Sequence, residues 1–142
     1  LAPGGSFAFQ VPDNFTSPSH LAIRDLRLSA KWQQRLGAGA DRVVGVAAPE
    51  AYLEAFESAG LRPDVWQTTY LHVLSGDQPV LEWVKGTALR PVLTALAGDP
   101  EATAEFLAEC GALLDRAYLN RPNGVIFPFR RIFAVGVDTM QR

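Results

Sequence analysis

The pattern of apolar positions along the chain predicts two long strands with a helical segment between them. Asp64–Leu74 and Val125–Val135 are rich in β-branched and aromatic residues, and both are bounded by glycine or proline. Residues 75–124 carry apolar residues at helical spacing instead. We therefore expect an antiparallel strand pair with an inserted helical lid, residues 75–124, over a site at one end of the sheet.

The first part of the chain predicts one more strand and two helices. Ser6–Val11 reads as a short buried strand, and Ser17 and Pro18 suit the N-cap and first position of a helix. The residues expected on the core side of this helix are Ala22, Ile23, Leu26 and Ala30. A second helix should start at Pro49 and stop at Gly60, after an aperiodic surface loop over residues 36–47.

Within the lid, helix signals divide the sequence into segments. One helix is expected over residues 79–85, and Gly86 with Pro91 should interrupt the pattern before a second apolar repeat. Asp99 is then placed to cap a helix that has Pro100 at its first position and ends near Tyr118. A turn at residues 121–124 leads into the last strand.

Composition places the chain among globular proteins of one domain. It has 142 residues, 48% hydrophobic residues and a formal net charge of −2. No apolar run is long enough to span a membrane, and the slightly acidic charge argues against nucleic acid as a partner. The single cysteine, Cys110, lies in an apolar helical stripe and is expected to be a core residue. Without a disulfide framework, we expect a cytoplasmic protein with neither nucleic-acid nor membrane partners.

The two histidines are candidate site residues that no spacing motif connects. His20 falls in the first helical turn after a strand end, where α/β sheets place ligands, but a solvated or capping role suits it equally. His72 lies on a strand between Leu71 and Val73. A hydrogen-bonded buried histidine is slightly favoured there over a ligand contact.

Three arginines are candidates for binding an anion. Arg130 and Arg131 are neighbours on a strand and should point to opposite faces, so that one can serve an ion pair and the other an anion. Arg90 lies in the lid, where a surface cation is the simpler interpretation. Cations converging from lid and sheet would suit a polycarboxylate, because guanidinium binds carboxylate in a bidentate manner.

Several sequence blocks resemble a known family. Leu1–Gly5 before a strand looks like the turn that opens the fifth strand of class I S-adenosylmethionine-dependent methyltransferases. More specifically, the sequence resembles the trans-aconitate 2-methyltransferase family in four blocks, which are residues 18–20, 64–72, 81–91 and 127–133. The resemblance runs nearly end to end and is poor over residues 37–48.

The resemblance implies an α/β fold, the C-terminal half of a Rossmann-like methyltransferase. It implies a three-stranded mixed sheet in the order fifth, seventh, sixth strand, formed with flanking helices by residues 1–74 and 125–142, and the lid between the last two strands. The chain starts without methionine, and the family's first four strands, Gly-rich cofactor loop and ribose-binding acid have no counterpart here. We therefore expect a truncated chain that is inactive alone, with S-adenosylmethionine bound mainly by the missing half.

The resemblance also implies methyl transfer to a carboxylate of a small polycarboxylic acid such as trans-aconitate. A carboxylate is already ionised at neutral pH, so no catalytic base is expected. The residues expected to bind the substrate acid are Arg90, Arg130 or Arg131, and His72, with His20 and Trp83 shaping the pocket.

Two alternatives stay open: a non-enzymatic dimerisation or ligand-binding module derived from a methyltransferase, and a methyltransferase for another small acid. In the complete methyltransferase fold that the resemblance implies, the strand at residues 6–11 would pair with a further strand on its outer side. We expect this edge to self-associate with another chain or to be covered by residues 37–48.

Overall fold

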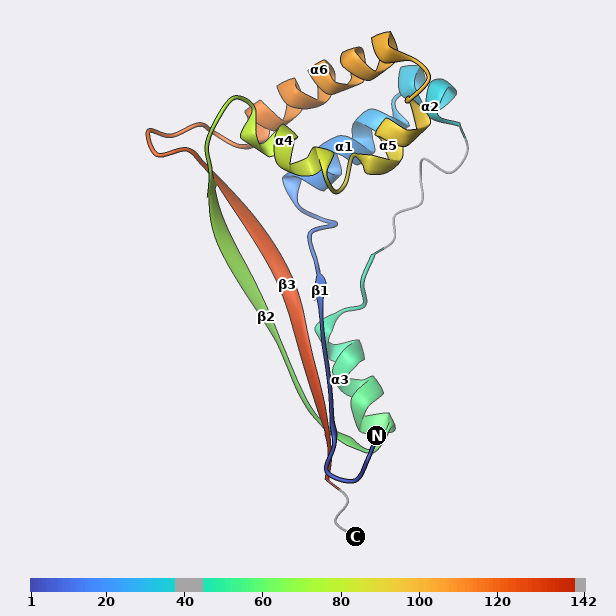
Figure 1. The fold of residues 1–142 in the computed structure, drawn as a ribbon, viewed down its shortest axis with the longest axis vertical. Helices are drawn as coiled ribbons and strands as arrows, with labels where there is room; N and C mark the ends of the chain where they lie inside the picture. Colours follow the sequence, from blue (N-terminus) through green and yellow to red (C-terminus); the bar gives the residue numbers. More distant parts are fainter. Residues whose placement is uncertain (38–44, 140–142) are drawn as a thin grey trace. The chain divides into compact units, whose positions relative to one another are not determined.

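The computed structural model describes residues 1–37 and 45–139, which form two compact units. Residues 1–14, 45–70 and 128–139 form what we call the strand unit, and residues 15–37 and 71–127 form the helical unit. Figure 1 shows the elements of each. Most of the predicted surface loop, and of the segment expected to cover the strand edge, lies outside the described residues.

The described strands form one sheet in the order β1-β3-β2. Their bounds are Ser6–Pro12 for β1, Leu61–Leu74 for β2 and Val125–Asp138 for β3. The predicted strand order is therefore confirmed. The expectation of a mixed sheet was wrong, because β3 lies in the middle and runs antiparallel to both neighbours, so that β1 and β2 never form a parallel ladder.

The strand unit packs one face of its sheet against helix α3, Pro49–Ser58. Phe56 of α3 is buried, and its ring meets those of Phe7 and Phe9 at centroid distances of 6.0 Å. The register of β1 on β3 pairs Phe7 with Gly136. A glycine is needed there because a Cβ on Gly136 would lie 3.2 Å from the Phe56 ring and 2.9 Å from Leu61 Cδ1.

The helical unit contains five helices within the described residues, drawn together in Figure 1. Their bounds are Pro18–Leu28 for α1, Ala30–Leu36 for α2, Pro79–Lys85 for α4, Arg90–Ala95 for α5 and Pro100–Ala117 for α6. The predicted helix over residues 79–85 is confirmed. So is the Asp99 cap, whose carboxylate accepts the Ala102 amide at 2.9 Å. No helix in the described ranges is long and apolar enough to cross a membrane.

The first predicted helix differs from the structure at its end. Ile23 and Leu26 are buried as expected, but the backbone becomes extended at Ser29 and the helix divides there into α1 and α2. Because of this break, Ala30 is exposed, and its expected place in the core was wrong. The core position of α2 is taken by Trp32, which is fully buried.

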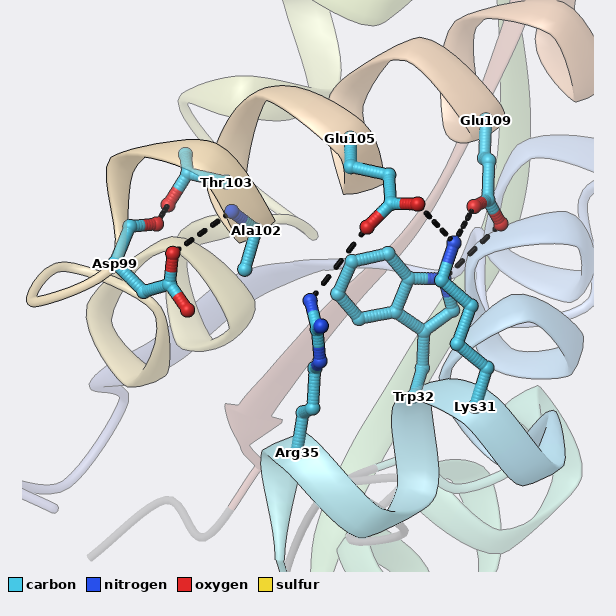
Figure 2. A network of polar contacts seen from close by, with 8 residues as sticks. All are labelled: Lys31, Trp32, Arg35, Asp99, Ala102, Thr103, Glu105 and Glu109. Atoms are coloured by element: carbon cyan, nitrogen blue, oxygen red, sulfur yellow. Dashed lines mark hydrogen bonds and ion pairs between the residues drawn. The ribbon is translucent and has the colours of Figure 1, made fainter.

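A polar network covers Trp32 and fastens α2 to α6 (Figure 2). The indole N–H of Trp32 donates to Glu109 at 3.0 Å, and the Trp32 ring packs edge-on against Phe106 at 4.9 Å. The Lys31 ammonium bridges Glu105, at 2.7 Å, and Glu109. These hydrogen bonds raise the pKa of Lys31 and lower the pKa of Glu109. The network thus joins α2 to α6.

Replacing Gly136 should destabilise the strand unit. Gly136→Ala inserts a methyl group against Phe56 and Leu61, and overpacking of this kind costs about 1–3 kcal/mol. Urea denaturation measures this loss. The control is Gly98→Ala, because nothing lies within 4 Å of the Cβ it would add. Equal denaturation midpoints for the two variants would show that α3 does not pack against the sheet as described.

Candidate functional site

The first turn of α1 carries a compact polar group, which we call the Ser–His cluster: Ser17, Ser19 and His20. Ser17 occupies the predicted N-cap, but its hydroxyl makes no capping bond to the backbone. It lies 3.0 Å from Ser19 Oγ and 3.0 Å from Nδ1 of His20. The His20 ring also meets the edge of Phe15 at a centroid distance of 5.8 Å. Ser17, which the sequence predicts as a helix cap, thus contacts the His20 imidazole instead.

Tyr118 performs the capping that Ser17 does not. The Ser19 amide is among the first N–H groups of α1, which have no acceptor within the helix. It donates to the Tyr118 hydroxyl at 3.0 Å, in a buried hydrogen bond between residues 99 positions apart. Ser19 is 0% exposed, so this amide has no access to water. Tyr118 therefore ties the start of α1 to the end of α6.

From Tyr118, ring contacts continue through what we call the aromatic series: Tyr118, Phe127, Trp83 and His72. The centroid distances are 5.4 Å from Tyr118 to Phe127, 5.7 Å from Phe127 to Trp83, and 4.9 Å from Trp83 to His72. Phe127 is buried, while Trp83 and His72 are half-buried. The series and the Ser–His cluster together connect three predicted site residues, His20, Trp83 and His72, within the helical unit.

Burial shifts the pKa of two titratable side chains in the helical unit. Burial lowers the pKa of His20 below 6.5, so its imidazole is neutral at neutral pH. Burial raises the pKa of Cys110 to about 11, which keeps this thiol protonated and confirms it as a core residue. Arg90 is exposed at the start of α5 and makes no ion pair with the described residues. Nor do those residues contain a group of three metal-ligating side chains.

Arg130 and Arg131 lie in the strand unit and have different partners. The guanidinium of Arg130 pairs with Asp13 at 2.9 Å, and its backbone exchanges hydrogen bonds with the Asn14 side chain at 2.8 and 3.1 Å. Arg131 donates to the neutral Gln10 side chain at 2.6 Å. Arg130 is therefore the ion-paired member of the two. The expected convergence of Arg90 with either residue stays a prediction, because they belong to different units.

Sequence reasoning missed the residues that connect the site. Tyr118 was taken only as a helix end and Phe127 only as a strand residue, although each contacts two elements of the helical unit. The sequence signals were present, since an isolated tyrosine at a helix end and a Ser-Pro-Ser-His turn are both visible. Nothing in either pattern indicates that they meet across 99 positions.

The side chains of the helical unit suit a small organic anion. The aromatic series offers flat apolar surface, His20 is neutral, and Arg90 is an exposed cation. Indole and imidazole faces pack well against planar conjugated groups, and guanidinium binds carboxylate. The fold and site thus define an α/β protein with a candidate anion-binding site in its helical unit.

Comparison with known proteins narrows this class. No family model matches the chain. The chain is 55% identical over 136 residues to a curated trans-aconitate 2-methyltransferase of Streptomyces avermitilis, which covers 95% of this chain and 49% of the relative. Proteins of the same name from Streptomyces coelicolor and Mycobacterium tuberculosis are 51% and 43% identical, again over 95% of this chain and over 45% and 52% of theirs.

The chain is thus a homologue of trans-aconitate 2-methyltransferases and spans about half the length of the curated relatives it matches. The resemblance stated from the four sequence blocks is confirmed.

Removing the Tyr118 hydroxyl should destabilise the helical unit. Tyr118→Phe keeps the ring contact with Phe127 but leaves the buried Ser19 amide without an acceptor, which costs about 1–3 kcal/mol. Chemical denaturation measures the change in unfolding free energy. Tyr52→Phe is a matched control, since its hydroxyl accepts the exposed Ala47 amide and its loss should cost under about 0.5 kcal/mol. If the two variants lose equal stability, Tyr118 does not cap α1.

Proposed function

We propose that this chain is the acceptor-binding part of a methyltransferase that transfers a methyl group from S-adenosylmethionine to a carboxylate of a small polycarboxylic acid, with trans-aconitate as the substrate. The observation that carries the proposal is the 55% identity, over 95% of this chain, to a relative named trans-aconitate 2-methyltransferase. The aligned length of 136 residues leaves only a few positions of this chain outside the match.

The arrangement of the helical unit supports this substrate class. An ionised carboxylate is itself the nucleophile, so the protein needs to hold it, orient it and exclude water. Arg90 is the proposed ionic contact, because it is exposed and makes no ion pair with the described residues. His72 and His20 would supply polar contacts, and Trp83 a flat apolar wall against the conjugated acid.

Of the two strand arginines, Arg131 is the better candidate for a substrate contact. Among the described residues, its guanidinium donates to the neutral Gln10 amide and lies 5.2 Å from the centroid of the Phe129 ring, and no ion pair is found for it there. Arg130 is engaged by Asp13 and is proposed to have a structural role. Its ion pair joins the segment after β1 to the central strand.

The described residues alone do not fit S-adenosylmethionine. The first two side chains after β1 are those of Asp13 and Asn14. The Asp13 carboxylate pairs with the Arg130 guanidinium, and the Asn14 side chain is bonded to the Arg130 backbone. Gln67 donates to the same Asp13 carboxylate at 3.2 Å. We propose that the cofactor is bound mainly by residues outside this chain, so that the 142-residue chain alone is inactive.

The position of β1 suggests a protein partner. β1 is an edge strand among the described strands, since β3 pairs with it on one side only. The backbone groups on its other side form a template for a further strand. We propose that this edge pairs with another chain, or with a further part of the same protein.

A chimera tests the proposed function. This chain replaces the matching half of the Streptomyces avermitilis relative, and methyl transfer to trans-aconitate is followed by mass spectrometry. We expect activity within about tenfold of the intact relative, because 55% identity preserves the packing of most core positions. The chain alone serves as the negative control. A folded chimera that binds S-adenosylmethionine and does not methylate trans-aconitate would refute the proposed substrate.

In the same chimera, Arg90→Ala should raise the Michaelis constant for trans-aconitate about ten- to a hundredfold. The loss of a hydrogen bond to a charged group costs about 1.5–3 kcal/mol, and a charge neutralised at the substrate acts mainly on binding. Arg116→Ala is the control, because Arg116 is another exposed cation of the helical unit, at the opposite end of α6 from Asp99. Equal constants for both variants would remove Arg90 from the site.

A further inference from the structure

The Ser–His cluster contains more hydroxyl protons than a simple helix cap requires. Each hydroxyl of Ser17 and Ser19 has one proton to donate, and each neutral imidazole has one N–H. Ser19 Oγ lies 3.0 Å from Ser17 Oγ and 3.5 Å from Nδ1 of His20, and Ser17 Oγ lies 3.0 Å from the same Nδ1. The placement of the imidazole proton therefore decides whether the three side chains satisfy one another without water.

If Nδ1 carries no proton, the cluster is satisfied within itself. The Ser19 hydroxyl donates to Ser17 Oγ, and the Ser17 hydroxyl donates to Nδ1 of His20. Both bonds then run in one direction, an arrangement in which each hydrogen bond strengthens the next. The backbone amide of Ser19 does not compete for these oxygens, because the Tyr118 hydroxyl already accepts it.

If Nδ1 carries the proton, the cluster is not satisfied within itself. Ser19 is 0% exposed, so its proton still goes to Ser17 Oγ, which then accepts from Nδ1 as well. The Ser17 proton must then leave the cluster for water, which this half-buried residue can reach. The hydrogen bonds no longer form one directed chain, so the first arrangement is favoured by cooperativity.

We propose that His20 is held as the neutral tautomer with its proton on Nε2, and that this N–H donates a hydrogen bond to one carboxylate of the acceptor acid. Nε2 makes no hydrogen bond within the described part of the chain, so its proton is available. A carboxylate only accepts hydrogen bonds, which matches a donor at this position. The contact with the acid rests on the proposed function, and the tautomer assignment does not.

The role of Tyr118 follows from the same geometry. By accepting the Ser19 amide, Tyr118 frees the N-cap hydroxyl of Ser17 to turn toward Nδ1. Tyr118 is thus a positioning residue, which acts on the substrate through the Ser–His cluster. It fixes which ring nitrogen of His20 carries the proton.

Ring-nitrogen NMR of the 142-residue chain tests the inference directly. The chain has two histidines, so His72→Gln leaves a single imidazole and assigns the His20 signals. At about pH 7.5, one unit above the ordinary imidazole pKa, we expect the protonated-nitrogen shift at Nε2 and the bare-nitrogen shift at Nδ1. A proton on Nδ1, or an even mixture of tautomers, overturns the proposal.

Variants of the Ser–His cluster test whether its hydroxyl groups determine the tautomer of His20. Ser17→Ala removes the donor to Nδ1 and should give a mixed tautomer, while Ser17→Thr keeps a hydroxyl and should restore Nε2–H. Tyr118→Phe should also weaken the preference. Thr16→Ala removes a neighbouring hydroxyl and should leave it unchanged. A pure Nε2–H tautomer in Ser17→Ala would show that the cluster does not hold it.

Titration with trans-aconitate then tests the contact. We expect the Nε2–H proton of His20 to shift downfield as the acid is added, because a carboxylate is a strong acceptor. Shifts elsewhere in the helical unit with an unchanged His20 would overturn the contact. If no resonance moves, the proposed substrate class fails and the contact fails with it, while the tautomer assignment is judged by the preceding spectra alone.

Discussion

The hydrogen bond from the Ser19 amide to the Tyr118 hydroxyl is the interaction on which the candidate site depends. It joins the first turn of α1 to the end of α6, and it is closed to water because Ser19 is fully buried. Without it, the Ser17 hydroxyl would be the nearest capping group for the helix. With it, the hydroxyls of the turn hold His20, and the Tyr118 ring begins the series that leads through Phe127 and Trp83 to His72.

Much of the fold was predictable from the sequence, because its signals are local. Proline and glycine punctuation marked the long strands, and the Asp99-Pro100 pair marked the start of α6. The break at Ser29 was missed, since the apolar repeat alone cannot tell a continuous helix from two short ones. The strand order was predicted from the family resemblance. The sheet is not mixed, because β3 separates the two strands that run in the same direction.

The candidate site was predictable only in part. His20, His72 and Trp83 were chosen from sequence blocks, and the structure connects them through contacts of the helical unit. Tyr118 was missed because its role depends on a hydrogen bond between residues 99 positions apart, which no local pattern encodes. Arg130 and Arg131 could not be distinguished by alternation alone. The ion pair with Asp13 distinguishes them, because that carboxylate engages one guanidinium and not the other.

The central claim is that the helical unit holds the acceptor acid beside His20. A crystal structure of the chimera with trans-aconitate bound tests it most directly. The account predicts density for the acid with a carboxylate oxygen within hydrogen-bond distance of Nε2 of His20, roughly 2.7–3.2 Å, and with its conjugated plane against the aromatic series. Density for the acid at full occupancy, away from both His20 and the aromatic series, would contradict the account.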